Sequence, residues 1–150
     1  MATPYSSDHL ESNSIDRNKS AIVAFASRFD PQPSHLDADA ADQSIFGGLC
    51  ASGWHIAALA TRLVIETLLD NGLPFVEMTS VSQLRWRQPT FVNEQISVRV
   101  ALGESLEESP IPDTRCQRLE IEVFNGNGAV VATMTASAAI ASEPVLAAST

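Results

Sequence analysis

An acidic side chain and an imidazole stand five positions apart early in the chain. The segment reads Asp30-Pro31-Gln32-Pro33-Ser34-His35, and its two prolines restrict the backbone between the two titratable groups. Such a pair can position a water molecule, accept its proton and return a proton elsewhere, as the addition of water across an activated double bond requires. An Asp-Pro segment followed by His is also an ordinary solvated turn. By itself the spacing therefore makes Asp30 and His35 a candidate catalytic pair and leaves the simpler interpretation open.

A glycine-rich segment precedes a long apolar stretch further along the chain. It reads Phe46-Gly47-Gly48-Leu49-Cys50-Ala51-Ser52-Gly53, and its glycines allow a close approach of the backbone to a ligand. Ser52 suits the position that caps the start of a helix. The free N–H groups of a helix start carry partial positive charge and can stabilise a carbonyl oxygen that becomes negative. The alternative is that the glycines serve only the turn and that Ser52 is only a cap.

Helical patterns surround both segments. Apolar residues at Ile22, Phe25, Ala26 and Phe29 form one helical stripe that Asp16 or Asn18 can cap. The two prolines then predict a rigid, non-helical turn from Asp30 to His35. A short helical piece is expected at 37–43, and a long helix at about 53–71, apolar on nearly every face and therefore buried.

The second half of the sequence changes to the period of β-strands. Strands are predicted at 81–87, 95–102, 118–124 and 130–140, with an exposed loop at 103–113. The sequence Asn-Gly-Asn-Gly at 125–128 is a strong hairpin signal. Trp86, which alternates with two arginines, is expected to pack on the long helix. Both Trp54 and Trp86 are expected to be core or interface residues. The order of elements predicts an α+β fold in which an antiparallel sheet wraps around one central helix.

Taken together, the two segments resemble the MaoC-like (R)-specific enoyl-CoA hydratases of the hot-dog fold. The family signature is D-x-N-P-x-H, followed by F-G-x-x-x-A and then a small polar residue or His before Gly. Here the two parts read D-P-Q-P-S-H and F-G-G-L-C-A-S-G, so Gln32 replaces the usual Asn. The resemblance extends over about residues 20–142, with a short N-terminus that leaves little sequence for the first strand of the family.

The resemblance implies an activity and a role for each matched residue. A trans-2-enoyl-CoA thioester would be hydrated to an (R)-3-hydroxyacyl-CoA, or the reverse. Asp30 would take a proton from the bound water, while His35 would hold that water and help to deliver a proton to the α-carbon. The backbone N–H of Gly53 would bind the thioester oxygen, and Ser52 would contact the thioester or orient the pair. The resemblance implies no metal or redox cofactor, and a homodimer or higher oligomer.

Other residues are weaker candidates. Arg62, Arg85 and Arg87 could contact the phosphates of CoA, although solvated arginines are the default interpretation. His55, and still less His9, is expected to be structural rather than catalytic. Two other functions stay open. A hot-dog thioesterase usually has its acid on the central helix, where only Glu66 and Asp70 are available. A catalytically silent acyl-CoA-binding module would keep the fold and lose the activity.

Composition limits the class of protein. The 150 residues fit one domain, which we place at 15–142 between a flexible arm at 1–14 and a tail at 143–150. A net charge of −9 disfavours nucleic acid as a partner. No segment resembles a membrane span or a signal peptide, so we expect a cytoplasmic protein. Cys50 and Cys116, far apart and without neighbouring histidines, are expected to be reduced and structural.

Overall fold

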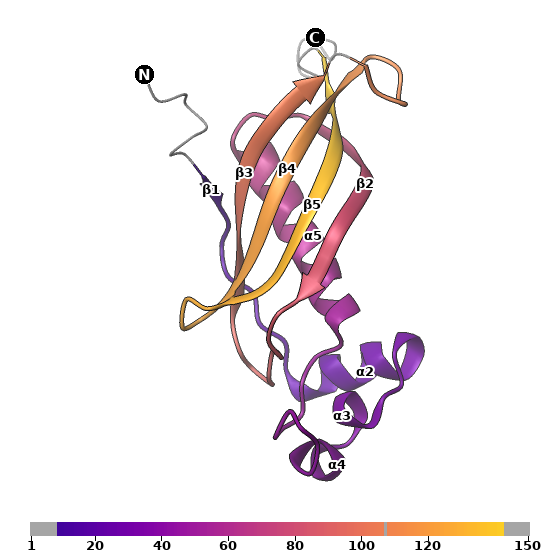
Figure 1. The fold of residues 1–150 in the computed structure, drawn as a ribbon, viewed down its shortest axis with the longest axis vertical. Helices are drawn as coiled ribbons and strands as arrows, with labels where there is room; N and C mark the ends of the chain where they lie inside the picture. Colours follow the sequence, from indigo (N-terminus) through magenta and orange to yellow (C-terminus); the bar gives the residue numbers. More distant parts are fainter. Residues whose placement is uncertain (1–8, 107, 143–150) are drawn as a thin grey trace.

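One long helix lies against a single antiparallel sheet, and three short helices gather beyond one end of it (Figure 1). The computed structural model describes residues 9–106 and 108–142. The five strands follow the order β1-β3-β4-β5-β2 across the sheet. The elements in chain order are β1 (Leu10–Glu11), α2 (Lys19–Phe29), α3 (Pro33–Leu36), α4 (Ala38–Asp42), α5 (Gly53–Asp70), β2 (Phe75–Trp86), β3 (Ile96–Leu106), β4 (Thr114–Asn125) and β5 (Val130–Ala141). This architecture confirms the predicted hot-dog fold.

The central helix α5 supplies one side of the core. Its buried residues include Ile56, Leu63, Val64 and Leu68, which pack with the inward side chains of the strands. Ser52 caps its start and Asn71 ends it, as the sequence predicted. Burial of so many aliphatic side chains, each worth roughly 1.5–3 kcal/mol, makes this helix and the sheet the stable body of the molecule.

Three strands extend well beyond their predicted bounds, and one of them is β4, which begins at Thr114 rather than at 118. β2 begins at Phe75, six residues before the predicted start, and it is an edge strand with several register shifts against β5. Gln83 within it has a positive φ of 52°, so the alternation that identifies a strand is broken. β3 continues to Leu106 because Ser105 and Leu106 still pair with β4, which makes the predicted loop at 103–113 too long.

The helices α2, α3 and α4 form a small lobe, residues 19–42, below the sheet in Figure 1. Asn18 caps α2 through a bond from the N–H of Ala21. The predicted non-helical turn at 30–35 is wrong in its second half, because Ser34 and His35 lie within α3. Pro33 occupies the first position of that helix, where its missing N–H costs nothing and its fixed φ favours the helical turn.

The N-terminal segment adds a short strand to the sheet. Leu10 and Glu11 pair with Val100 and Arg99 of β3, within the expected arm at 1–14. Residues 1–8 of that arm and the whole expected tail at 143–150 lie outside the described residues. In the part of the chain that the structure describes, no helix has the length and apolar character needed to cross a membrane.

Candidate active site

Asp30 ends α2 and faces the start of α5. Its Oδ2 accepts a hydrogen bond of 2.6 Å from the hydroxyl of Ser52, and its Oδ1 accepts one of 2.6 Å from the amide of Gln32. The Ser52 hydroxyl also accepts a hydrogen bond of 3.2 Å from the N–H of Trp54, so it caps the helix while it donates to the carboxylate. The hydroxyl oxygen that caps α5 is thus also bonded to the carboxylate of Asp30.

His35 lies beside this carboxylate with its protonation pattern set by the backbone. Its Nδ1 is 2.8 Å from the carbonyl oxygen of Cys50. Because a carbonyl can only accept, Nδ1 must carry the hydrogen, and the neutral ring then has its lone pair on Nε2. That Nε2 lies 3.6 Å from Oδ2 of Asp30, too far for a direct hydrogen bond. Oδ2 of Asp30 and Nε2 of His35 are thus two neighbouring acceptor atoms that are not bonded to each other.

The surroundings keep Asp30 ionised. The hydrogen bond from Ser52 lowers the pKa of the carboxyl most, and burial opposes this effect. The Gln32 amide and the charge of His35 lower the pKa further, so the net direction is below the usual value of 3.8. The side chain of Asp30 is only 15% exposed and that of His35 only 10%. A carboxylate and an imidazole lone pair are therefore held in a sheltered position, ready to accept hydrogen bonds from a third molecule.

The start of α5 adds donors to the same place. Gly53 is the first residue of the helix, and its N–H has no partner within the helix because of that position. Gly53 lines a cavity of about 320 Å³ together with Asp30 and His35. The cavity has a buried apolar lining that includes Ile56 and Val131. Its other lining residues are Gln32, Phe46, Cys50, Ala51, Trp54, Trp86, Arg87, Gln88, Pro89 and Thr90.

The predicted arginines separate in the structure. Arg87 lines the cavity and also a shallower hollow that it shares with Arg85, Glu120 and Thr133. Arg62 instead pairs with Glu66 at 3.2 Å on the exposed surface of α5. It lies about 13 Å along the helix axis from Gly53, given the helical rise per residue. Of the three arginines, only Arg87 lines the cavity of Asp30 and His35.

The remaining histidine and cysteines follow the structural interpretation. His55 is buried and stacks on Phe25 of α2 with ring centroids 4.5 Å apart. Burial, reinforced by the charge of Arg17, lowers the pKa of His55 and favours its neutral form. Cys50 and Cys116 are free, and burial raises the pKa of the Cys50 thiol, which keeps it protonated. Among the described residues, no group of three potential ligands could hold a metal ion.

Sequence reasoning missed several residues of the site. Trp54 and Trp86 were expected in the core or an interface, yet they are 57% and 43% exposed and line the cavity. Trp86 does contact α5, as expected, at its first two residues, Gly53 and Trp54. Thr90 lines the cavity after β2, and its buried hydroxyl has no partner among the described residues. Nothing in the spacing of Trp86 and Thr90 marks them, because they reach the cavity from the C-terminal end of β2.

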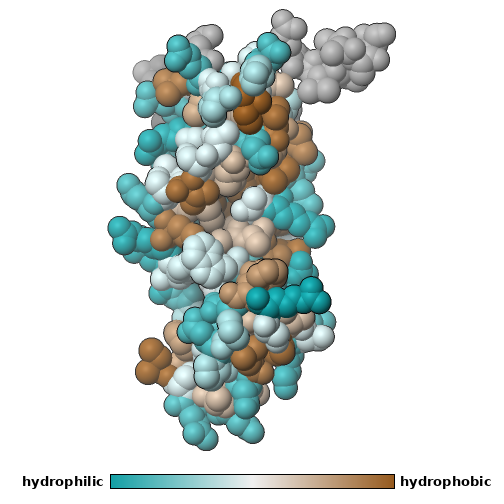
Figure 2. Space-filling view, turned by 90° about the vertical axis from the view of Figure 1, so that its right-hand side faces the viewer, coloured by the Kyte–Doolittle hydropathy of each residue, from teal (hydrophilic) through white to brown (hydrophobic). Residues whose placement is uncertain are grey.

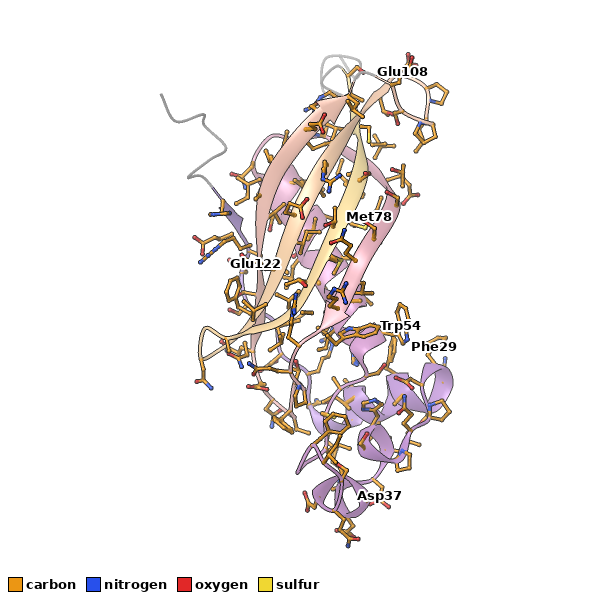
Figure 3. All side chains as sticks on the ribbon, in the orientation of Figure 1. Phe29, Asp37, Trp54, Met78, Glu108 and Glu122 are labelled. Atoms are coloured by element: carbon orange, nitrogen blue, oxygen red, sulfur yellow. The ribbon has the colours of Figure 1, made fainter. Side chains whose placement is uncertain are left out.

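Figure 3 shows where the site lies. Phe29, at the end of α2, and Trp54, in the first turn of α5, are drawn at the junction between the lobe and the body, whereas Asp37 is at the far end of the lobe. The site is therefore assembled from two parts of the chain. The lobe supplies the acid–base pair, and the body supplies the helix start and the apolar wall.

This arrangement can do one kind of chemistry well. A water molecule between these two acceptors can donate one hydrogen bond to Asp30 and one to His35, which leaves its oxygen lone pairs free for attack. Donors at a helix start can stabilise an oxygen that gains negative charge. A long helix wrapped by an antiparallel sheet, with an acid–base pair at the helix start, defines the class as a hot-dog protein with a hydration type of site.

Comparison with known proteins places the chain within that class. Residues 3–116 match the family model described as MaoC like domain. The MaoC-like dehydratase from Rhodospirillum rubrum is 34% identical, with a TM-score of 0.75 over 91% of this chain and 92% of that one. The chain belongs to the MaoC-like dehydratase family, which is of the hydratase or dehydratase kind.

Two further proteins are similar to this chain. The uncharacterized protein YdeM of Bacillus subtilis (strain 168) is 28% identical over 101 residues, which is 67% of this chain and 69% of that protein. The (R)-hydratase from A. caviae involved in PHA biosynthesis has the same fold. It gives a TM-score of 0.70 at 23% identity, over 87% of this chain and 92% of that chain.

Proposed function

We propose that the protein is a lyase that adds water across the double bond of a trans-2-enoyl-CoA to give an (R)-3-hydroxyacyl-CoA, or catalyses the reverse. One observation carries the proposal most directly. Oδ2 of Asp30 and Nε2 of His35 are 3.6 Å apart, and both residues line the same cavity as Gly53, the first residue of α5. A water molecule and an activated carbonyl are the two reactants that such a pair of subsites suits.

The chemical steps follow from the direction of each hydrogen bond. Water donates to Asp30 and His35, and its oxygen forms a bond to the β-carbon of the thioester. The proton that the water loses passes to the acid–base pair and from there to the α-carbon. Negative charge that develops on the thioester oxygen is stabilised by the N–H of Gly53, and loss of such a donor typically costs about 3–4 kcal/mol in barrier. The CoA moiety belongs to the substrate, and the proposed steps use no other cofactor.

Binding of the CoA phosphates is assigned to two arginines at the edge of the site. Arg87 is the arginine at the cavity, and Arg85 lies next to it in the adjoining hollow, whose lining also includes Glu120 and Glu122. In a chain of net charge −9, two neighbouring guanidinium groups offer the local positive field that phosphates need. Arg62 is left out of this assignment because Glu66 neutralises it at a distance from the site.

A homodimer or higher homo-oligomer is part of the proposal. β2 is an edge strand, and its Val76 and Val81 are 44% and 47% exposed. The face of the molecule on the β2 side carries apolar side chains among polar ones (Figure 2). Pairing of β2 with the same strand of a second copy would cover this edge. Light scattering during size-exclusion chromatography should then give at least twice the 16.1 kDa mass of one chain.

The activity is tested with crotonyl-CoA as substrate. Loss of the ultraviolet absorbance of the conjugated thioester, without release of free thiol and with an (R) product on chiral analysis, is the expected result. The Asp30→Asn variant should not turn over but should still bind the ligand. Asp42→Asn is a matched control, because Asp42 is exposed at the end of α4.

Other outcomes would point to other functions. Release of free thiol would indicate a thioesterase, although among the described residues no carboxylate from α5 lines the cavity. No reaction with crotonyl-CoA or with longer and branched enoyl-CoAs, together with binding of the thioester, would indicate a silent acyl-CoA-binding module. In that case the Gln32→Asn variant, which restores the family motif, is the first to assay for turnover.

A further inference from the structure

Trp86 touches Gly53 at two points. The indole Nε1–H donates a hydrogen bond of 2.8 Å to the carbonyl oxygen of Gly53. The ring also lies over the α-carbon, because a Cβ at position 53 would be 2.5 Å from Cε2 of the ring and 2.7 Å from Cδ2 and Nε1. No real Cβ approaches other atoms so closely, so only glycine fits beneath this ring. The last residue of β2 thus fixes the first residue of α5.

The peptide group between Gly53 and Trp54 is held from both ends. Its carbonyl accepts the indole of Trp86, and its N–H donates to the hydroxyl of Ser52. The same hydroxyl donates to the catalytic carboxylate of Asp30. Hydrogen bonds therefore connect the indole, the first peptide of the helix, the capping serine and the acid in one continuous series.

Such support matters because glycine is the residue with the greatest backbone freedom. The N–H of Gly53 belongs to the peptide that joins Ser52 to Gly53, so its direction depends on the ψ angle of Ser52 and the φ angle of Gly53. The bond from the indole restricts the ψ angle of Gly53 through its carbonyl, and the ring above the α-carbon fixes the position of the residue that carries the N–H. Trp54 packs its ring edge-on against Trp86, with centroids 4.9 Å apart, and so limits the rotation of the indole in turn.

We propose that Trp86 is a positioning residue that holds Gly53 in place so that the backbone N–H of this residue points at the thioester oxygen. The proposal rests on the hydratase function proposed above. It goes further by assigning a role to a residue outside both motif segments. The alternative is that the indole only covers apolar surface. The hydrogen bond to a helix carbonyl and the 43% exposure of the ring both disfavour that alternative.

The first test removes the indole donor and keeps an aromatic ring. Trp86→Phe should lower kcat about 10-fold while KM changes less than about 2-fold. The reason is that the indole positions the Gly53 N–H, and this N–H acts on charge that develops in the transition state. The melting temperature should stay close to that of the wild type. Ser82→Ala, an exposed position earlier on β2, is the control and should leave both constants unchanged. An unchanged kcat in Trp86→Phe would overturn the proposal.

The second test uses the steric contact. Gly53→Ala should lower both the melting temperature and kcat, since its methyl group collides with the ring. Combining it with Trp86→Leu should restore the melting temperature, because the ring is gone, but should not restore kcat, because the indole donor is gone too. If Gly53→Ala is equally damaging to the melting temperature with and without Trp86, the ring does not constrain Gly53 and the proposal is wrong.

The two proposals can fail separately. Absence of wild-type turnover on the whole panel of enoyl-CoAs would overturn the hydratase function and, with it, the role given to Trp86. Wild-type turnover that is unaffected in Trp86→Phe would overturn only the role of Trp86. If the activity of Trp86→Phe falls only as far as its lowered melting temperature explains, the contribution of Trp86 is merely structural, and this result would also overturn that role.

Discussion

The lobe and the body of this molecule divide the work between them. The body, α5 with the sheet, contains most of the buried aliphatic side chains. The lobe, residues 19–42, buries Ile22, Ala26 and Ala41 and two polar residues of α3, Ser34 and His35. It carries both members of the acid–base pair. Stability therefore depends mainly on one region and the proposed chemistry on the other.

Polar bonds connect the two regions at the site. Ser52 donates to Asp30, His35 donates to the carbonyl of Cys50, and the N–H of Cys50 donates to the carbonyl of Ser34 at 3.2 Å. Each such bond contributes only about 0.5–1.5 kcal/mol to stability but fixes a direction in space. The comparison shows that the site uses directional bonds for precision, while the strength of the fold comes from apolar packing elsewhere.

The largest expected effect is on catalysis in the lobe. Asp30→Asn should lower kcat about 10³-fold, because general base catalysis typically contributes 10²–10⁴. The melting temperature should change little, since the amide still accepts the Ser52 hydroxyl. Steady-state kinetics and a thermal melt measure the two effects. A large loss of stability with intact turnover would contradict the division between lobe and body.

The converse effect is expected in the body. Leu68→Ala should lower the free energy of unfolding by about 2–5 kcal/mol, because Leu68 is fully buried in α5 and its truncation leaves a cavity. The neighbouring Leu69 is 52% exposed, so Leu69→Ala should cost less than about 0.5 kcal/mol. Urea denaturation measures both. Any folded Leu68→Ala protein should keep the wild-type kcat, and a fall in kcat would break the comparison.

Ser52 stands between the two regions, so its removal should affect both, but less strongly. Ser52→Ala should cost about 1 kcal/mol of stability through the lost helix cap. It should also raise the pKa of Asp30, because the Ser52 bond is the main cause of the lowered value. If Asp30 controls the acid limb of kcat/KM, that limb should then move to higher pH. An unmoved limb would mean that Asp30 does not control this part of the profile.

The smallest effect concerns the contact between His55 of the body and Phe25 of the lobe. The pKa of His55 is lowered in the folded protein, so the unfolded chain takes up a proton first as the pH falls. Stability should be fully present above about pH 6.5 and should fall as the pH drops from there toward the folded pKa. His55→Phe should remove this part of the pH dependence, and His9→Ala should not. Denaturation curves from pH 5 to pH 8 measure it.

Much of the body was predictable because its patterns are regular. The apolar stretch at 53–71 is too long and too uniformly apolar for a solvated helix, and Asn125 to Gly128 can hardly form anything except a turn. The start of β2 was missed because an edge strand with register shifts loses its alternation. α3 was missed because Pro33 was interpreted as a helix breaker, although proline also begins helices.

The site was only half predictable. The two motif segments could be recognised in the sequence from their residue types and spacing. The structure brings their four candidate residues together, namely Asp30, His35, Ser52 and Gly53. How Trp86 and Thr90 approach them depends on where β2 ends relative to α5. That is a property of the tertiary packing, and local sequence does not record it. The separation of Arg62 from the site has a different cause, because it follows from the helical rise along a helix that the sequence already predicted.

The bond from His35 to the carbonyl of Cys50 has an evolutionary consequence. The atom that selects the tautomer belongs to the main chain, and every amino acid supplies the same carbonyl. Position 50 can therefore exchange its side chain for another that fits the same buried space without changing which nitrogen carries the proton. A carboxylate in this place could be lost by a single codon change, whereas a backbone oxygen cannot. Substitutions at position 50 therefore leave this tautomer of the His35 imidazole unchanged, because they do not remove the backbone carbonyl that selects it.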